Sequence, residues 1–287
     1  MDGFSRAAEL LPEEYRRALV PEDRNAEEIR LRLGRAPTLL LGGRERRITE
    51  RPVSERDLKC VLERASGASL HAVADALREG YLSCGGVRIG VCGTLLPGGV
   101  DGGFQSFSSL ALRIPRECRG LGRELLPALR ENASGGTLIL APPGGGKTTL
   151  LRELIRCLSN GGLRIGVVDE RNELSATDGG RARFDLGARS DVLVGARKAE
   201  GAMLLLRSMN PRLIAMDEIT RKEDLKAVSE IAGCGVGVLA TAHAESVEQM
   251  RRRALYRALL DSGIFRMAIR IRGEGTERRV SIEELEA

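Results

Sequence analysis

Hydrophobic and polar residues alternate in the first part of the chain. Ile29, Leu31 and Leu33 recur at every second position, and an apolar run at 38–41 follows after a Gly-Arg-Ala-Pro turn. A period of two residues places these side chains on one face of an extended backbone. The pattern therefore predicts two strands joined by a turn.

The spacing of apolar residues then lengthens to three and four. Apolar residues with this spacing follow Ser54 and predict a short amphipathic helix that begins with a serine cap. A second short helix is expected around 70–77. Strand-like segments return at 86–93 and 110–114, with a glycine-rich loop at 98–103 between them. This mixture of strands and helices predicts a small α+β domain.

Beyond a predicted helix at 120–135, short apolar strands alternate with helices. The strands are expected at 137–140, 164–169, 213–217 and 236–241, and the helices from 148, at 198–208 and at 223–232. Continuous apolar strands that alternate with helices are typical of a parallel sheet covered on both faces. We therefore predict an α/β protein with two domains, a smaller N-terminal α+β domain at 1–125 and an α/β domain at 126–287.

Composition excludes several classes of protein. With 42% hydrophobic and 30% charged residues, the chain of 287 residues fits neither a disordered nor a membrane-embedded protein, and no transmembrane segment or secretory signal is expected. The net charge of +5 either is solvated surface charge or forms a basic face for phosphates or anionic lipids. The six cysteines include no Cys-x-x-Cys pair, which favours free thiols in a reducing cytosol.

A glycine-rich loop lies between the predicted strand at 137–140 and the helix that follows it. Glycines let the backbone curl so that its N–H groups and the helix N-terminus face phosphates, while a lysine reaches the β and γ oxygens and a hydroxyl binds Mg²⁺. Only the first position departs from the usual pattern, because alanine replaces glycine. We predict that ATP is bound by Ala141, Pro142, Pro143, Gly144, Gly145, Gly146, Lys147, Thr148 and Thr149.

Two carboxylates end a later apolar strand. Asp217 and Glu218 follow the run Leu-Ile-Ala-Met, an arrangement that also occurs in purely structural roles. Because it comes after a phosphate-binding loop, we expect Asp217, together with Thr148, to hold Mg²⁺ and Glu218 to orient or deprotonate the attacking water. The sequence thus predicts a RecA-like P-loop ATPase domain in the second half of the chain.

Charged residues follow two further apolar strands. Glu170 lies in the run Val-Val-Asp-Glu-Arg, at a strand end where ligand sites collect in open α/β sheets. A solvated loop without a ligand would have the same sequence pattern. His243 ends the run Ala-Thr-Ala-His and could sense the γ-phosphate, although a lone histidine is more often structural. His71, in the second predicted helix, is expected to be structural.

These four strand ends, in this order, resemble the additional-strand ATPases that drive type II secretion, type IV pili and type IV secretion. In those proteins a Walker A loop is followed by an acidic box, a Walker B strand and a His box. Within that superfamily the chain is most similar to the stage III sporulation protein AA family. The resemblance covers nearly the whole chain and rests on the phrases EEIRLRLGRAP, GGVRIGVCG, VVDERNEL, KAEGAMLLLRSMNPRLIAMDEI and VLATAH.

The resemblance implies an ATPase on the mother-cell side of the channel between mother cell and forespore. It would be cytoplasmic, peripheral at the inner face of a membrane, anchored by membrane proteins of that channel and assembled as a hexameric ring. Arg88 and Arg113 resemble N-terminal-domain arginines that reach the nucleotide of a neighbouring subunit. The chain departs from the larger secretion ATPases because it lacks their zinc-binding cysteines.

We therefore expect an ATP-hydrolysing motor with ATP and Mg²⁺ as cofactors. Its catalytic residues would be Lys147, Glu218 or Glu170, His243, Arg88 and Arg113, with Glu218 favoured as the base because it follows Asp217. One alternative is a nucleic-acid-binding RecA-like ATPase, favoured by a pI near 9.0 but opposed by 3% aromatic residues, so nucleic acid is not the expected partner. Another is a scaffold that binds ATP without hydrolysing it.

Overall fold

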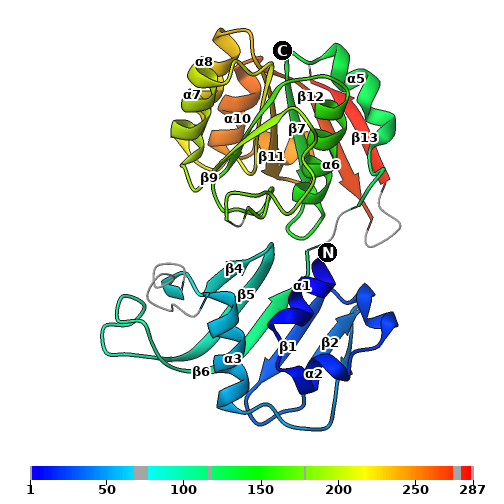
Figure 1. The fold of residues 1–287 in the computed structure, drawn as a ribbon. Coiled ribbons are helices and arrows are strands. Elements are labelled where there is room, and N and C mark those ends of the chain that lie inside the picture. The colour runs from blue at the N-terminus through cyan, green and yellow to red at the C-terminus, as the bar shows by residue number, and fades with distance from the viewer. Residues whose placement is uncertain (1, 68–76, 116–117, 178, 274–278, 286–287) are drawn as a thin grey trace. The chain divides into compact units, whose positions relative to one another are not determined.

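The computed structural model describes residues 2–67, 77–115, 118–177, 179–273 and 279–285. It divides into two compact units, Met1–Arg116 and Glu117–Ala287, drawn from blue through cyan to blue-green and from green to red (Figure 1). The domain limits expected from the sequence, 1–125 and 126–287, remain a prediction. No helix among the described residues is both long and apolar enough to cross a lipid bilayer.

The first unit is built on a six-stranded antiparallel sheet with strand order β3-β2-β1-β6-β5-β4. Its strands are β1 (Glu28–Arg32), β2 (Thr38–Leu41), β3 (Arg44–Arg47), β4 (Tyr81–Cys84), β5 (Val87–Leu95) and β6 (Phe104–Arg113). Its helical segments are α1 (Gly3–Leu10), α2 (Glu13–Arg17), the 3₁₀ turn η1 (Pro21–Asn25) and α3 (Glu55–Ala65). The alternating Ile29 and Leu31 are fully buried against the helices, as a period of two requires.

Asp57 anchors the start of α3. It forms a capping box with Ser54, whose N–H donates to the carboxylate at 2.8 Å. The Tyr15 hydroxyl and the Arg51 guanidinium also donate to this carboxylate, each at 2.9 Å. Burial alone would raise the pKa of Asp57, but the hydrogen bonds from Arg51, Ser54 and Tyr15 outweigh it and lower that pKa to about 2.

One predicted segment of this unit is longer than expected, and another falls largely outside the described residues. The strand predicted at 110–114 begins earlier, at Phe104, because β6 pairs with the extended β5 in a hairpin whose connection contains the predicted glycine-rich loop. The second predicted helix, with His71, falls largely on residues 68–76, which lie outside the described residues.

The second unit contains a seven-stranded sheet with order β13-β12-β7-β11-β10-β8-β9. Its strands are β7 (Gly136–Ala141), β8 (Ile165–Asp169), β9 (Ser190–Val194), β10 (Leu213–Met216), β11 (Gly237–His243), β12 (Phe265–Arg272) and β13 (Arg279–Glu284). All pairings are parallel except that of β12 with β13. The predicted parallel sheet is thus present, with one antiparallel strand added at its edge.

Helices cover both faces of this sheet, as Figure 1 shows. They are α5 (Leu126–Glu131), α6 (Lys147–Asn160), α7 (Lys198–Ser208), α8 (Lys222–Gly233), α9 (Val247–Arg251) and α10 (Ala254–Asp261), with a 3₁₀ turn η3 (Arg123–Leu125) before α5. On β10, Ile214 and Met216 pack with α7, α8 and α10, whereas Leu213 and Ala215 pack with α5 and α6. Burial on both faces explains why these strands are continuously apolar.

The helix predicted at 120–135 is shorter than expected. Pro127 has no N–H to donate, so it is tolerated in the first turn of a helix but not in its interior. The structure accordingly has a 3₁₀ turn at Arg123–Leu125 and begins α5 at Leu126. The prediction of one continuous helix was wrong in this segment.

Candidate active site

The predicted phosphate-binding loop connects β7 to α6, at the carboxyl edge of the parallel strands. Gly144 and Gly146 have φ angles of +75° and +90°, which are favourable only for glycine. A Cβ atom on Gly145 would lie 2.7 Å from the Cβ of Ala141 and 3.0 Å from the Pro142 carbonyl oxygen. The backbone therefore needs three consecutive glycines, and it leads directly into the N-terminus of a helix of 14 residues, which suits a phosphate group.

Lys147 is buried at the start of α6. Its Nζ donates to the carbonyl oxygens of Ala141 and Pro142 at 2.9 and 3.1 Å, and lies 3.0 Å from Nδ1 of His243. Burial lowers the pKa of this ammonium, and the charges of Asp217 and Glu218 oppose that effect. The lysine is thus held over the loop with its charge beside two carboxylates.

Thr148 and Asp217 meet across the sheet edge. The Thr148 hydroxyl donates to Oδ2 of Asp217 at 2.9 Å. A hydroxyl and a carboxylate are hard oxygen ligands, and Mg²⁺ in nucleotide sites is commonly held by one or two such groups together with phosphate oxygens. This pair therefore fits the magnesium ion predicted from the sequence, and both predicted metal ligands lie together.

Glu218 points at the histidine. Its Oε1 accepts from Nε2 of His243 at 2.9 Å, and Arg171 lies 3.9 Å from its other oxygen. Because an ammonium can only donate, Nδ1 of the same ring accepts from Lys147, and the other ring nitrogen is the one that donates to Glu218. Lys147, His243 and Glu218 therefore form one continuous hydrogen-bonded chain.

Thr241 is a site residue that sequence reasoning missed. This buried side chain donates to Oδ1 of Asp217 at 2.6 Å and accepts from the backbone N–H of Glu218 at 2.8 Å. The available signal was a polar residue inside an otherwise apolar strand, two positions before His243 and so on the same side of β11.

Asp169 and Glu170, the two acidic residues at the end of β8, have different roles. Asp169 is buried and accepts from the backbone N–H groups of Glu173, Leu174 and Ser175 and from the Ser175 hydroxyl, so it shapes the loop. Glu170 pairs instead with Lys198 on α7. Burial would raise the pKa of Glu170, but the hydrogen bond and charge of Lys198 outweigh it, and the pKa is lowered.

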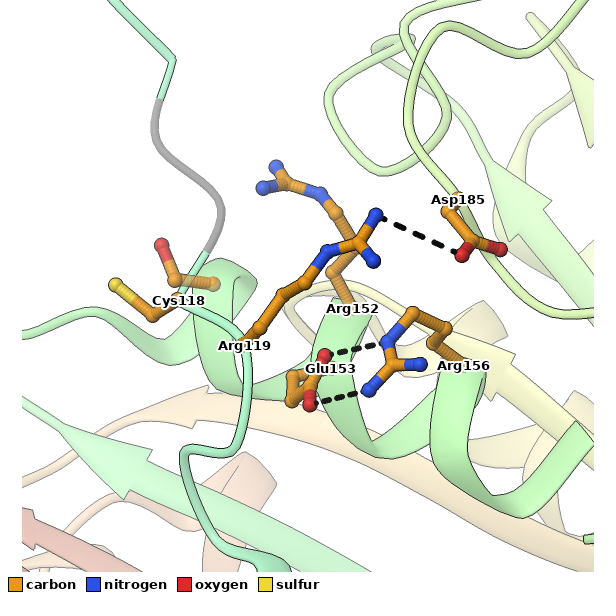
Figure 2. Close-up of a pocket in the computed structure, with 7 residues that line it drawn as sticks. Cys118, Arg119, Arg152, Glu153, Arg156 and Asp185 are labelled. Atoms are coloured by element: carbon orange, nitrogen blue, oxygen red, sulfur yellow. Dashed lines mark hydrogen bonds and ion pairs between the residues drawn. The ribbon is translucent and has the colours of Figure 1, made fainter. Parts of the chain in front are cut away.

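Arg152 ties this loop to α6. Its guanidinium donates to the carbonyl oxygens of Glu173 and Leu174 at 2.9 and 3.0 Å and lies over the Phe184 ring at 3.8 Å. It also lines a small pocket beside the phosphate-binding loop (Figure 2). The pocket is lined by Cys118, Arg119, Thr149, Arg152, Glu153, Arg156 and Asp185.

Ion pairs occupy most of the charged groups in that pocket. Figure 2 shows Arg156 bound to both oxygens of Glu153, at 2.7 Å each, and Arg119 approaching Asp185 at 3.8 Å. The N–H of Gly120 also donates to Glu153 at 2.7 Å. These contacts fix the segment that leads into the unit against the side of α6.

The two predicted N-terminal arginines are neighbours within the first unit. Arg88 on β5 and Arg113 on β6 are opposite each other in the antiparallel pair. The Arg88 guanidinium lies over the Tyr81 ring, 3.9 Å from its centre, and Nε of Arg113 is 3.6 Å from Glu28. Their role toward a nucleotide remains a prediction.

Known proteins resemble this chain in sequence and in fold. The family described as "Sporulation stage III, protein AA" matches residues 6–282. Stage III sporulation protein AA of Bacillus subtilis (strain 168) is 35% identical over 292 residues, which cover 96% of this chain and 94% of the relative.

Two solved structures share the fold. The ATPase DotB of Legionella pneumophila has a TM-score of 0.62 and 20% identity, covering 91% of this chain and 77% of its own. The pilus retraction motor PilT with bound ADP has a TM-score of 0.63 and 18% identity, covering 91% and 80%. The predicted fold class, a RecA-like P-loop domain with a smaller α+β domain, is confirmed, and the chain belongs to the stage III sporulation protein AA family.

Proposed function

We propose that this chain is an ATP-hydrolysing motor. The observation that carries the proposal is that Lys147, His243 and Glu218 form one hydrogen-bonded chain beside the pair of Thr148 and Asp217. These residues come from two strand ends and one helix start that are far apart in sequence. A phosphate cradle, hard oxygen ligands and a carboxylate in one place are what phosphoryl transfer to water needs.

Each residue has a task in this proposal. The glycine-rich backbone and Lys147 bind the phosphates, and Thr148 and Asp217 hold Mg²⁺, which when bound neutralises negative charge on the phosphate oxygens. Glu218 accepts a proton from the attacking water, and the Nε2–H of His243 keeps its carboxylate oriented. Because His243 also contacts Lys147, the base and the phosphate-binding lysine are positioned together.

Glu218 is the better candidate for the base. Its carboxylate directly follows Asp217 and contacts the histidine that contacts Lys147. Glu170 is engaged by Lys198, and its lowered pKa makes it a weaker proton acceptor. We assign Glu170 a positioning role through this ion pair.

The first test is magnesium-dependent hydrolysis of ATP by the purified chain. The wild type should release phosphate, whereas Lys147→Ala should neither hydrolyse ATP nor bind it tightly, because the loop has no other cation for the phosphates. Lys222→Ala, on the exposed start of α8, is the matched control and should behave as the wild type. Absence of hydrolysis in the wild type would leave the ATP-gated scaffold, and unchanged turnover in Lys147→Ala would remove the proposed site.

Assembly and location belong to the same proposal. As the resemblance noted from the sequence implies, we propose a hexameric ring, peripheral at the inner face of a membrane on the mother-cell side and bound to membrane proteins of the channel to the forespore. The molecular mass in solution, measured with and without ATP, tests the ring directly. A monomer under both conditions, at concentrations that support hydrolysis, would contradict it.

A further inference from the structure

Thr241 is a buried hydroxyl in an apolar strand. It lies on β11 between Ala240 and Ala242, and its side chain is inaccessible to solvent. Valine has nearly the same shape and favours strands equally, so the strand itself does not require a hydroxyl. A buried hydroxyl is costly unless its hydrogen bonds are satisfied, and here they are satisfied by two groups of the candidate site.

Only a hydroxyl can make both of these bonds with one atom. Oγ1 of Thr241 donates to Oδ1 of Asp217 at 2.6 Å and accepts from the N–H of Glu218 at 2.8 Å. The other oxygen of Asp217 accepts from Thr148. Thr241 therefore fixes the rotation of the carboxylate that presents its second oxygen to Thr148.

The same contact holds an unusual backbone. Glu218 has a φ angle of +38°, in the left-handed region that favours glycine. The pairing of β10 with β11 ends at Met216 and Ala240, so no regular strand pairing supports the residues that follow. Thr241 supplies the support instead, because its side chain accepts from the N–H of Glu218 and its carbonyl oxygen accepts from the N–H of Ile219 at 3.0 Å.

We infer that Thr241 is a positioning residue that couples the orientation of the metal-binding Asp217 to the direction of the Glu218 side chain. The inference rests on the proposed function. Without the hydroxyl, the Asp217 carboxylate loses its shortest hydrogen bond, and the N–H of Glu218 keeps only its 3.0 Å bond to Asp217. Both carboxylates then become less well aligned, although neither is removed.

The test compares Thr241→Val with Thr241→Ser and with Thr137→Val. Thr137 is the matched control, because it is buried in the neighbouring strand β7 and its hydroxyl accepts a hydrogen bond from Asn132, which is not in the site. Loss of supporting hydrogen bonds around metal ligands typically costs about 10- to 100-fold in metal affinity or activity. We expect Thr241→Val to lower kcat by about 10- to 100-fold and to raise by a similar factor the Mg²⁺ concentration that half-saturates binding of a fluorescent ATP analogue.

The KM for ATP should change little, because the phosphate-binding loop is intact. Thr241→Ser should restore activity, and Thr137→Val should hydrolyse ATP as the wild type does. A second readout is hydrogen exchange of the Glu218 amide, which should become faster in Thr241→Val and stay slow in the other two variants. A merely structural role would lower the melting temperature without moving the Mg²⁺ midpoint or the amide exchange.

The outcomes separate this inference from the proposed function. If the wild type hydrolyses ATP but Thr241→Val matches Thr137→Val in turnover and Mg²⁺ midpoint, the inference is overturned and the function stands. If the wild type does not hydrolyse ATP, the function fails, and the Mg²⁺ midpoint and the Glu218 amide still decide the inference. In that case, a higher Mg²⁺ midpoint and faster exchange of the Glu218 amide in Thr241→Val, but not in the other two variants, support the inference. No change in either quantity overturns the inference.

Discussion

Replacing each candidate base by glutamine should affect two different properties of the protein. In Glu218→Gln the amide oxygen can still accept from Nε2 of His243, so the local contacts survive while the proton acceptor is lost. In Glu170→Gln the Lys198 ammonium loses its charged partner. We therefore expect the first variant to fail in catalysis and the second to lose stability.

The sizes of the two effects follow from the contacts. A general base contributes about 10² to 10⁴ in rate, so Glu218→Gln should lose that factor in kcat with near-normal ATP affinity. The side chain of Lys198 is only 10% exposed, and a hydrogen bond between charged groups contributes about 1.5–3 kcal/mol. In a unit of this size that loss corresponds to about 3–12 °C in Tm for Glu170→Gln.

The assay pairs single-turnover hydrolysis with thermal unfolding of the same samples. Binding of a fluorescent ATP analogue confirms that each variant is loaded before the chemical step is timed. Glu131→Gln, on the exposed end of α5, is the control for the substitution itself and should change neither quantity. Near-normal chemistry in Glu218→Gln together with collapse in Glu170→Gln would reverse the assignment of the base.

Two further predictions concern the first unit. An arginine finger contributes about 10³ to 10⁵ in rate, so Arg113→Ala should be inactive, as Lys147→Ala should be. If Arg113 acts on the nucleotide of a neighbouring subunit, mixing the two variants should restore part of the hydrolysis activity. No rescue in confirmed mixed assemblies would refute the trans role. Asp57→Asn should lower the unfolding free energy of this unit by about 2 kcal/mol at neutral pH, because the pKa of Asp57 is lowered from 3.8 to about 2 on folding. A carboxylate whose pKa is lowered on folding stabilises the folded state at pH values above its pKa in the unfolded chain. The difference in unfolding free energy between wild type and Asp57→Asn should therefore shrink as pH falls from about 4 to about 2. A difference that does not depend on pH would contradict this account.

The fold was predictable where periodicity and burial agree. Strands β7, β8, β10 and β11 lie at the centre of the sheet, and burial on both faces makes them continuously apolar and easy to recognise. The edge strands were missed, because β9 is half-exposed throughout and β13 mixes exposed and half-buried residues. β12 was missed as well, although its arginines alternate with apolar residues.

The candidate site was predictable to the extent that its residues carry familiar chemistry. The glycine-rich loop, Asp217 and Glu218 each follow a strand, and the parallel sheet brings their strand ends to one edge. Thr241 was missed, since one polar residue in an apolar strand is a weak signal and its importance depends on a hydrogen bond to the end of the neighbouring strand. The role of Asp169 was equally hidden, because an aspartate after a strand looks the same whether it binds a ligand or its own loop.

The hydrogen bonds of Arg152 divide the site into two mechanical parts. Arg152 on α6 donates to the carbonyl oxygens of Glu173 and Leu174, so we expect the loop after β8 to move together with α6. Glu218 is attached to β11 through Thr241 and stays with the sheet. The distance between the loop and Glu218 should therefore report the position of α6, and a pair of spectroscopic labels on those two parts would test whether α6 moves when ATP is added.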